Sequence, residues 1–283
     1  MGDATFPRTA ELPDQTPLYW VGQKDRYLRQ QLIRDIEAIT KRRLIVYFAN
    51  RFATGSDIAD DDPIFMTELL TDVKANEPVD LMIETNGGKT DSTEALVSLL
   101  SNRIKNLRTV VANAAKSNGT LVALAGKTIV MGPSSELGPI DPHLNGIPCT
   151  VLSQPQVAQT NFPLQQLAEL GLKQTRKLAT KLLKEGMLKG TADAVIDTLV
   201  NDLATRNTYF SHGSTIDHVE AARLGLKVKA LKADDPLWRR LWLLYTMYDF
   251  DARRDGYLKI FEGRALSTAV AQLAAANPSP PGP

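Results

Sequence analysis

The sequence has 283 residues, of which 43% are apolar and 23% charged, a composition typical of a soluble globular protein. Its formal net charge of +1 excludes a strong overall attraction to nucleic acids or acidic membrane surfaces. The single cysteine, Cys149, excludes an intrachain disulfide framework and a cysteine-rich zinc site, and it favours a reducing, cytoplasmic compartment.

Residues 1–22 contain three prolines and little periodicity, so we expect an extended N-terminal arm. They lack the basic start and the apolar stretch of a secretory signal. No uninterrupted apolar run in the chain approaches the ~18 residues that a membrane helix needs. We therefore expect a soluble protein with no membrane partner.

Residues 23–230 alternate between helical and strand patterns. Apolar residues recur at helical spacing in the first segment, at Leu28, Leu32 and Ile36, whereas Arg43–Ala49 is a continuous apolar run typical of a buried strand. Helices are predicted at residues 24–41, 63–75, 92–103, 119–125, 163–188 (broken at Gly171), 191–205 and 216–224. Strands are predicted at residues 43–49, 79–85, 109–113, 127–131 and 226–230. This alternation indicates an α/β fold with a parallel sheet and right-handed crossovers.

Residues 231–272 form an aromatic C-terminal segment with a helix predicted at residues 237–249. Trp238, Trp242 and Tyr245 recur there at helical spacing, so this aromatic face packs either on its own domain or on a second copy. Residues 273–283 include four prolines and are predicted to be disordered.

Two loops carry residues suited to catalysis. Asn86-Gly87-Gly88 follows a predicted strand, at the end where parallel sheets bind ligands, and its backbone N–H groups suit an oxyanion hole. Ser117-Asn118-Gly119 lies at a strand-to-helix junction, where helix dipoles stabilise negative charge. Each loop alone is typical of ordinary structure, a tight turn in the first case and an N-cap serine in the second.

The two loops together resemble the Clp protease proteolytic subunit and signal peptide peptidase A, and most closely the serine dehydrogenase proteinase family. The matching motifs are Ile58–Asp62, Thr85–Gly88, Ser117–Ala125, Leu137–Pro142 and the turn at His212. The resemblance implies a ClpP/crotonase-like parallel sheet of repeated β-β-α units with flanking helices, and a homo-oligomer. Three positions depart from the family pattern: Asn86 replaces proline, Asn118 a small residue, and His143 glutamine.

The resemblance implies that Ser117 is the nucleophile and that an oxyanion site is formed by Gly87, Gly88, Asn118 and Gly119. A serine hydroxyl needs a base to take its proton. The candidates, in order of preference, are His212, His143 and a lysine such as Lys173 or Lys181. Asp141 is a candidate to orient the imidazole. No metal and no organic cofactor are implied.

Three functions remain open. The first is a Clp-like serine peptidase that cleaves peptides or proteins through a Ser117 acyl-enzyme, with an ATPase or adaptor as a further potential partner. The second is a crotonase-type acyl-thioester enzyme, which uses similar oxyanion geometry. The third is a non-catalytic oligomeric scaffold or partner-binding protein, which the departures at Asn86, Asn118 and His143 favour.

Overall fold

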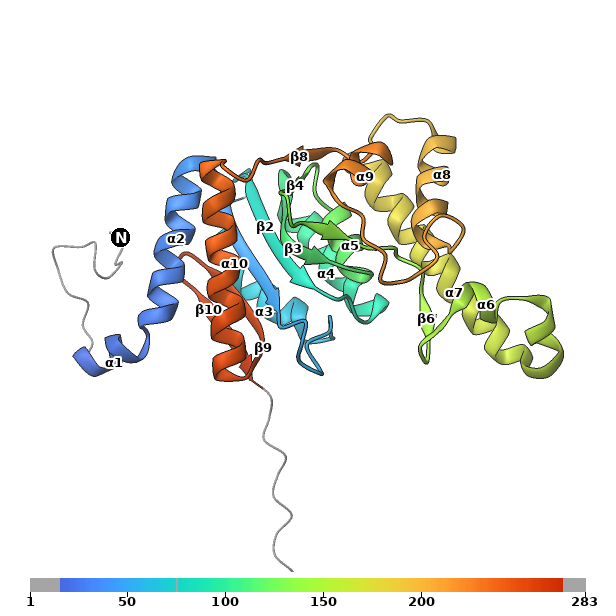
Figure 1. Cartoon of the computed structure of the whole chain (residues 1–283), viewed down its shortest axis with the longest axis horizontal. Helices are drawn as coiled ribbons and strands as arrows, with labels where there is room; N and C mark the ends of the chain where they lie inside the picture. The colour runs from blue at the N-terminus through green and yellow to red at the C-terminus, as the bar shows by residue number, and fades with distance from the viewer. Residues whose placement is uncertain (1–15, 75, 272–283) are drawn as a thin grey trace, which may run out of the picture.

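A β-sheet forms the centre of the molecule, with helices on both of its faces (Figure 1). The computed structural model describes residues 16–74 and 76–271. The main strands there are β1 (Arg43–Ala49), β2 (Val79–Thr85), β3 (Leu107–Ala115), β4 (Ile129–Met131), β8 (Val228–Ala230), β9 (Tyr257–Gly263) and β10 (Ser267–Ala271). Their order is β10-β9-β1-β2-β3-β4-β8, and all neighbours from β1 to β8 are parallel. The predicted α/β fold with a mostly parallel sheet is confirmed.

The helices follow the predicted helical segments closely. Those of the described residues are α1 (Pro17–Gly22), α2 (Lys24–Thr40), α3 (Asp62–Leu69), α4 (Thr90–Arg103), α5 (Asn118–Leu124), α6 (Cys149–Leu152), α7 (Pro155–Glu185), α8 (Asp193–Ala204), α9 (His218–Arg223) and α10 (Pro236–Asp255). The short strands are β5 (Glu136–Leu137), β6 (His143–Leu144) and β7 (Ile147–Pro148). None of these helices is both long enough and apolar enough to cross a membrane.

The central strands β1 and β2 are buried along their whole length because both faces of the sheet are covered. In β1, Ile45 and Tyr47 belong to a cluster with side chains of α3, α4, α5, α7 and α8. Val46 and Phe48 belong to a second cluster with side chains of α2 and α10. Successive side chains of a strand point to opposite faces, so each central strand contributes to both cores.

Two expectations about helices are wrong. Residues 17–22 form α1 rather than an extended arm, because Pro17 occupies the first turn and the Thr16 side chain caps the helix; residues 1–15 lie outside the described part. The long helix α7 breaks at Asn161 (φ −150°, ψ 76°) and not at Gly171. Pro163 interrupts the helix there, and the Asn161 side chain accepts from Leu164 N–H, so the second part of α7 begins with its own cap.

The C-terminal segment is part of the same sheet, which corrects the expected boundary at residue 231. After α10 the chain forms β9 and β10, and β9 pairs antiparallel with β1. The aromatic face of α10 packs on its own domain: Trp238, Tyr245 and Tyr248 are buried. A Cβ atom at Gly132 would lie 2.3 Å from the Trp238 ring, so this contact requires glycine. The predicted disordered tail, residues 273–283, lies outside the described residues.

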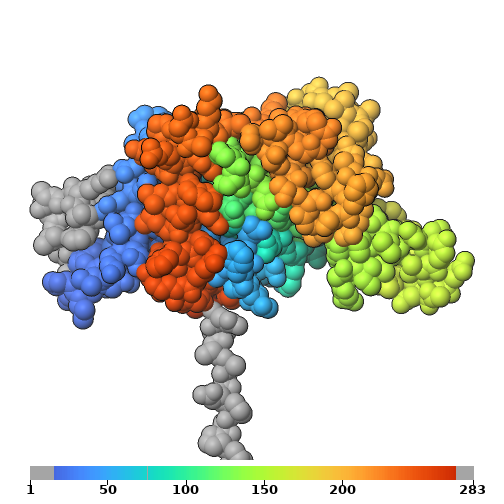
Figure 2. Space-filling view, viewed as in Figure 1, coloured from blue at the N-terminus to red at the C-terminus, as the bar shows by residue number. Residues whose placement is uncertain are grey.

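One part of the molecule projects from the body. Helix α6 and the first part of α7 extend away from the sheet as an arm, drawn in lime in Figures 1 and 2. The arm has its own small apolar cluster, which includes Cys149, Leu152 and Ala168. Its base is the hairpin of β6 and β7, which borders the cleft described next.

Candidate active site

Most of the predicted site residues line a cleft of about 580 Å³ at the carboxyl ends of the parallel strands, and Gly87, Gly119 and Asp141 lie outside its lining. Its lining comprises Asn86, Gly88, Thr90, Ser117, Asn118, Ile140, Pro142, His143, Gly146, Thr175, Arg206, Ser211 and His212. Asp141 lies directly behind this lining and is hydrogen-bonded to His212. The cleft thus brings together segments that are more than a hundred residues apart in the chain.

Ser117 lies at the sharp turn between β3 and α5. Its backbone has φ 52° and ψ −123°, a left-handed conformation that is strained for a residue with a side chain. A serine on a strained strand-to-helix turn, with its hydroxyl presented to a cleft, is the arrangement of nucleophile elbows in hydrolases. Within the described residues, Ser117 Oγ has no hydrogen-bond partner, so its hydroxyl is available to a substrate or a base.

The Gly87-Gly88 loop is held against the acidic segment that the sequence analysis singled out. Ile58 N–H donates to Gly87 O (2.7 Å), and Lys89 N–H donates to Ile58 O (3.0 Å). A Cβ atom at Gly88 would lie 2.3 Å from Ile58 N, and one at Gly87 would lie 2.8 Å from Ser117 Cβ. Both glycines also have positive φ, 105° and 152°. Only glycine allows this close approach of the loop to both neighbours.

The four predicted oxyanion residues differ in the availability of their N–H groups. Gly87 N–H donates to Thr85 Oγ1 (3.0 Å), and Gly119 N–H donates to Lys116 O (2.7 Å). Within the described part of the chain, the N–H groups of Gly88 and Asn118 have no acceptor. These two residues line the cleft on either side of Ser117, so their N–H groups are the free donors beside the hydroxyl.

The two asparagines that depart from the family pattern both fasten the oxyanion loop. The Asn118 side chain donates to Gly88 O and to Thr90 Oγ1 (3.3 Å), so it joins the loop to the start of α5. Asn86 forms a reciprocal pair with Arg51: Arg51 Nε donates to Asn86 Oδ1 (2.6 Å) and Asn86 Nδ2 donates to Arg51 O (2.9 Å). A proline at position 86 has no side-chain polar group, so it could make neither bond.

His212 and Asp141 form the close acid–base pair of the cleft. His212 Nδ1 lies 2.6 Å from Asp141 Oδ1. A carboxylate only accepts hydrogen bonds, so Nδ1 carries a proton, and in the neutral tautomer of this ring Nε2 is the acceptor. Among the described residues, Nε2 has no partner. Burial raises the pKa of Asp141, but hydrogen bonds from His212 and Arg206 outweigh it and hold that pKa below its ordinary value, so the carboxyl is ionised.

Both ring nitrogens of His143 are occupied. Its Nδ1 lies 3.0 Å from Asp141 O, an acceptor, so Nδ1 is protonated, and its Nε2 lies 3.0 Å from an Arg206 nitrogen that can only donate. Burial, and next the neighbouring His212 ring, lower the pKa of His143 and keep it neutral. The two rings meet edge to face at 4.3 Å. His143 therefore buttresses His212 rather than presenting a free base.

The same residues form the one candidate metal-binding group among the described residues. Potential ligand atoms of Asp141, His143 and His212 lie within 4.8 Å of one another. Arg206 already donates to both Asp141 Oδ2 (3.1 Å) and His143 Nε2. A divalent cation at this group would have to displace the guanidinium and overcome its repulsion, so the donor set fits an ion-pair network better than a metal.

The lysine candidates lie away from the cleft lining. Lys173 pairs with Glu169 on the surface of α7, and Lys181 is exposed. Lys116, for which the sequence analysis gave no role, is buried. Arg51 and Arg206 bond to the loops of the site at exposed and half-buried positions, respectively. Neither Arg51 nor Arg206 belongs to a sequence motif, so sequence reasoning missed both. The tertiary structure alone brings them to the site.

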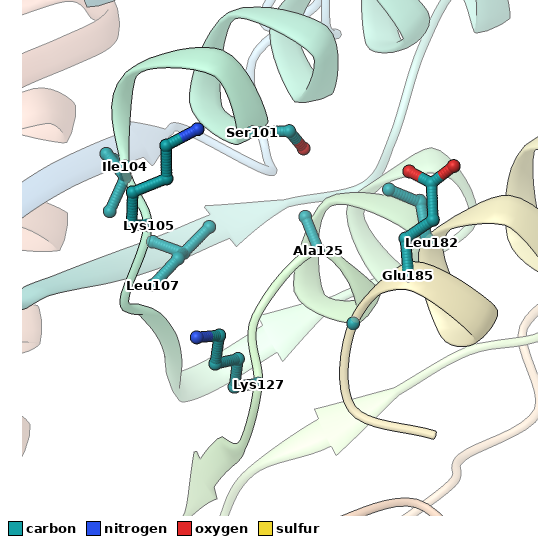
Figure 3. Close-up of a pocket in the computed structure, with 9 residues that line it drawn as sticks. Ser101, Ile104, Lys105, Leu107, Ala125, Lys127, Leu182 and Glu185 are labelled. Atoms are coloured by element: carbon teal, nitrogen blue, oxygen red, sulfur yellow. The ribbon is translucent and has the colours of Figure 1, made fainter. Parts of the chain in front are cut away.

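A second cavity lies at the opposite end of the sheet, at the start of β3, and is shown in Figure 3. It measures about 200 Å³ and has an apolar floor that includes Leu107 and Leu182. The Lys105 and Lys127 side chains lie across it from Glu185 (Figure 3). It contains none of the predicted site residues.

Comparison with known proteins identifies relatives. The model of the family described as ClpP-like SDH-type serine proteinase matches residues 26–249. Two uncharacterized proteins of Methanocaldococcus jannaschii are similar: MJ0137 is 26% identical over 67% of this chain and 66% of its own length, and MJ1495 is 24% identical over 56% and 55%. The chain thus spans just under two thirds and just over half of these relatives. Among solved structures, a mutant of the membrane-bound stomatin-specific protease 1510-N has a TM-score of 0.42 and 17% identity, over 65% of this chain and 79% of that one.

Proposed function

This chain belongs to the family of ClpP-like SDH-type serine proteinases, and on that premise we propose that it is a serine peptidase in which Ser117, His212 and Asp141 act together. The observation that carries the proposal is the orientation of His212. Its Nδ1 is bonded to Asp141, and its Nε2 is unpartnered among the described residues and belongs to the cleft that Ser117 also lines. An imidazole held at Nδ1 by a carboxylate, with Nε2 open to the cleft, is suited to serve as the base for a serine nucleophile.

The proposed reaction is acyl transfer to Ser117. His212 Nε2 takes the hydroxyl proton as Ser117 Oγ attacks the peptide carbonyl, and Asp141 stabilises the imidazolium that forms. The C–N bond then breaks, and His212 returns the proton to the leaving amine. Water attacks the acyl-enzyme with the same base and regenerates Ser117. The Ser117–His212 hydrogen bond is not formed in the free structure; such bonds commonly tighten when substrate binds.

The oxyanion of the tetrahedral intermediate is proposed to accept from the N–H groups of Gly88 and Asn118. Both are free of acceptors among the described residues, and they flank Ser117 in the cleft. Loss of one such donor typically costs about 3 kcal/mol of transition-state stabilisation. The bond from Ile58 N–H to Gly87 O supports this role, because Gly87 O and Gly88 N–H belong to the same peptide group and the bond holds that group in place.

The lining of the cleft supports a polypeptide substrate over an acyl thioester. Its side chains are mostly polar, and the aliphatic contribution is limited to Ile140 and Pro142. The hydroxyl groups of Thr90 and Thr175 can both donate and accept, so they suit the repeated N–H and C=O groups of an extended peptide. A fatty acyl chain would need an apolar pocket instead.

The test is labelling with a fluorophosphonate probe, which reacts with activated serines. Wild type should label at Ser117, and Ser117→Ala should not label at all. His212→Ala and Asp141→Asn should lower the labelling rate by at least about 10³-fold, because the base is lost or loses its orientation. His218→Ala is the matched control, since it removes a histidine outside the cleft, and it should label at the wild-type rate.

Two outcomes would contradict the proposal. If His143→Ala abolishes labelling while His212→Ala leaves it intact, the base has been assigned to the wrong imidazole. If folded wild type does not label under any condition that supports folding, the chain is a non-catalytic member of its family and the scaffold function takes precedence.

A further inference from the structure

A buried ammonium group joins the nucleophile to the histidine loop, residues 211–215. Lys116 directly precedes Ser117, and the residue is 8% exposed. Its Nζ donates to Ser214 O (3.1 Å) and Leu137 O (3.2 Å), and it pairs with Glu136 Oε2 (2.9 Å). All three ammonium hydrogens therefore have acceptors, which is what burial of this charge requires.

The Glu136 carboxylate is shared by the three segments that form the site. Besides Lys116 of the nucleophile turn, Glu136 accepts from Thr215 Oγ1 of the histidine loop (2.7 Å). Its other oxygen lies 3.7 Å from an Arg51 nitrogen. Burial raises the pKa of Glu136, but Lys116 and Thr215 outweigh this and lower it, so the carboxylate is charged.

Arg51 carries the connection on to the oxyanion loop. Its guanidinium lies between Glu136 and Glu84 and donates from Nε to Asn86 Oδ1. Asn86 in turn donates to the Arg51 backbone carbonyl. The position of the Gly87-Gly88 loop is thus tied, through one guanidinium, to the carboxylate that also holds the nucleophile turn and the histidine loop.

We propose that Glu136 is a positioning residue for the proposed hydrolysis, and that its carboxylate holds the nucleophile turn, the histidine loop and the oxyanion loop in register. The inference rests on the proposed function and deepens it. The backbone bridge between Leu137 and Ile216 fixes only the end of the histidine loop. Residues 211–215 include His212. A backbone carbonyl of this loop accepts from Lys116, and a side-chain hydroxyl of the loop donates to Glu136, so these two residues hold the loop next to the nucleophile turn.

The charged network explains how a chain with Asn86 keeps a rigid oxyanion loop. Where proline would restrict the backbone, Asn86 is instead fixed by two bonds to Arg51. Charge-assisted hydrogen bonds are shorter and stronger than neutral ones. Displacements of about 1 Å at a catalytic group cost on the order of 100-fold in rate, so register among the three loops matters.

The experiment measures fluorophosphonate inactivation in wild type, Glu136→Gln and Asp80→Asn. Asp80 is the matched control, because it is a buried carboxylate of β2 paired with Arg42 and Arg108 at the other end of the sheet. Glu136→Gln should lower the inactivation rate constant roughly 10- to 100-fold and leave the probe's reversible binding constant within about twofold. Asp80→Asn should change neither. Equal rates in Glu136→Gln and wild type would overturn the positioning role.

Hydrogen exchange separates failure of this inference from failure of the proposed function. Glu136→Gln should accelerate amide exchange in residues 86–88 and 211–215, and Asp80→Asn should not. If wild type does not label, the peptidase proposal fails and exchange alone decides: unchanged exchange in both segments refutes the positioning role. If Glu136→Gln does not fold, Thr215→Val decides, because it removes a single exposed hydroxyl; it should slow inactivation several-fold, and an unchanged rate contradicts the inference.

Discussion

Ser117 stores backbone strain at the point where chemistry is proposed. Its φ of 52° is unfavourable for any residue with a Cβ, and such conformations cost on the order of 1–3 kcal/mol. The surrounding structure imposes it: Lys116 N–H donates to Thr85 O on one side, and Gly119 N–H donates to Lys116 O on the other. The strain turns the hydroxyl out of β3 and into the cleft.

Replacement of Ser117 by glycine and by alanine measures this strain. Ser117→Ala removes the hydroxyl but keeps the Cβ, so its free energy of unfolding should be close to that of wild type. Ser117→Gly relieves the strained φ and should be about 1 kcal/mol more stable than Ser117→Ala, after the added flexibility of the unfolded chain is subtracted. Urea unfolding gives both values. A glycine variant less stable than the alanine variant would show that Ser117 is not strained.

The general base for Ser117 could not be chosen from the sequence alone. His212 and His143 both border Asp141, and the choice between them depends on Arg206, which occupies Nε2 of His143. Arg206 belongs to no motif, and it is 65 residues from Asp141 in the chain. The loops of Ser117 and the paired glycines, by contrast, could be located because they directly follow predicted strands, and the family resemblance supplied their expected roles.

At the scale of the element, strand β2 ends in a buried acid. Glu84 is 3% exposed and accepts from Asn113 Nδ2 and Ala114 N–H of β3, both at 2.8 Å. Burial raises its pKa from 4.5 to about 7, although these two bonds and Arg51 oppose the shift. The end of β2 that leads into the oxyanion loop therefore titrates near neutral pH.

This shift predicts a pH dependence of stability. The folded protein binds the Glu84 proton more tightly than the unfolded chain, so the contribution of Glu84 to stability is fully present below about pH 4.5 and is lost as pH rises to about 7. The loss amounts to roughly 3 kcal/mol. The free energy of unfolding of wild type minus that of Glu84→Gln should fall by this amount between pH 5 and pH 8. Parallel curves for the two proteins would contradict the assignment, whatever their offset.

Strands with a continuous apolar run of three or more residues could be predicted from the sequence, and β9 could not. Arg43–Ala49 and Val79–Thr85 coincide with their predicted ranges because the first is apolar from residue 44 to 49 and the second from residue 81 to 83. In β9 the residues Lys259 and Glu262 interrupt the pattern, and both are buried. Each is paired with a partner about 200 residues away, Asp62 and Arg29, and no local pattern reveals such a partner.

At the scale of the whole molecule, strand β9 near the C-terminus is connected to the oxyanion loop. Lys259 of β9 donates to Asp62 Oδ1 (2.6 Å) at the start of α3. Asp62 Oδ2 accepts from Ala59 N–H (3.0 Å), next to Ile58, whose backbone pairs with the Gly87-Gly88 loop. Strand β9 therefore supports the acidic segment on which the oxyanion loop rests.

Breaking the buried Lys259–Asp62 ion pair should lower the free energy of unfolding strongly, and a second substitution should restore part of the loss. Both residues are almost wholly buried, and burial raises the pKa of Asp62 even though Lys259 and Tyr47 donate to it. Lys259→Met leaves this carboxylate without its cation and should cost about 3–5 kcal/mol in the free energy of unfolding. Adding Asp62→Asn removes the uncompensated charge, so the double variant should be more stable than Lys259→Met alone. Lys127→Met, at an exposed lysine, is the control and should stay within about 0.5 kcal/mol of wild type. A cost for Lys259→Met no larger than that of Lys127→Met would mean that β9 is held by its backbone pairing with β1 and not by this buried charge.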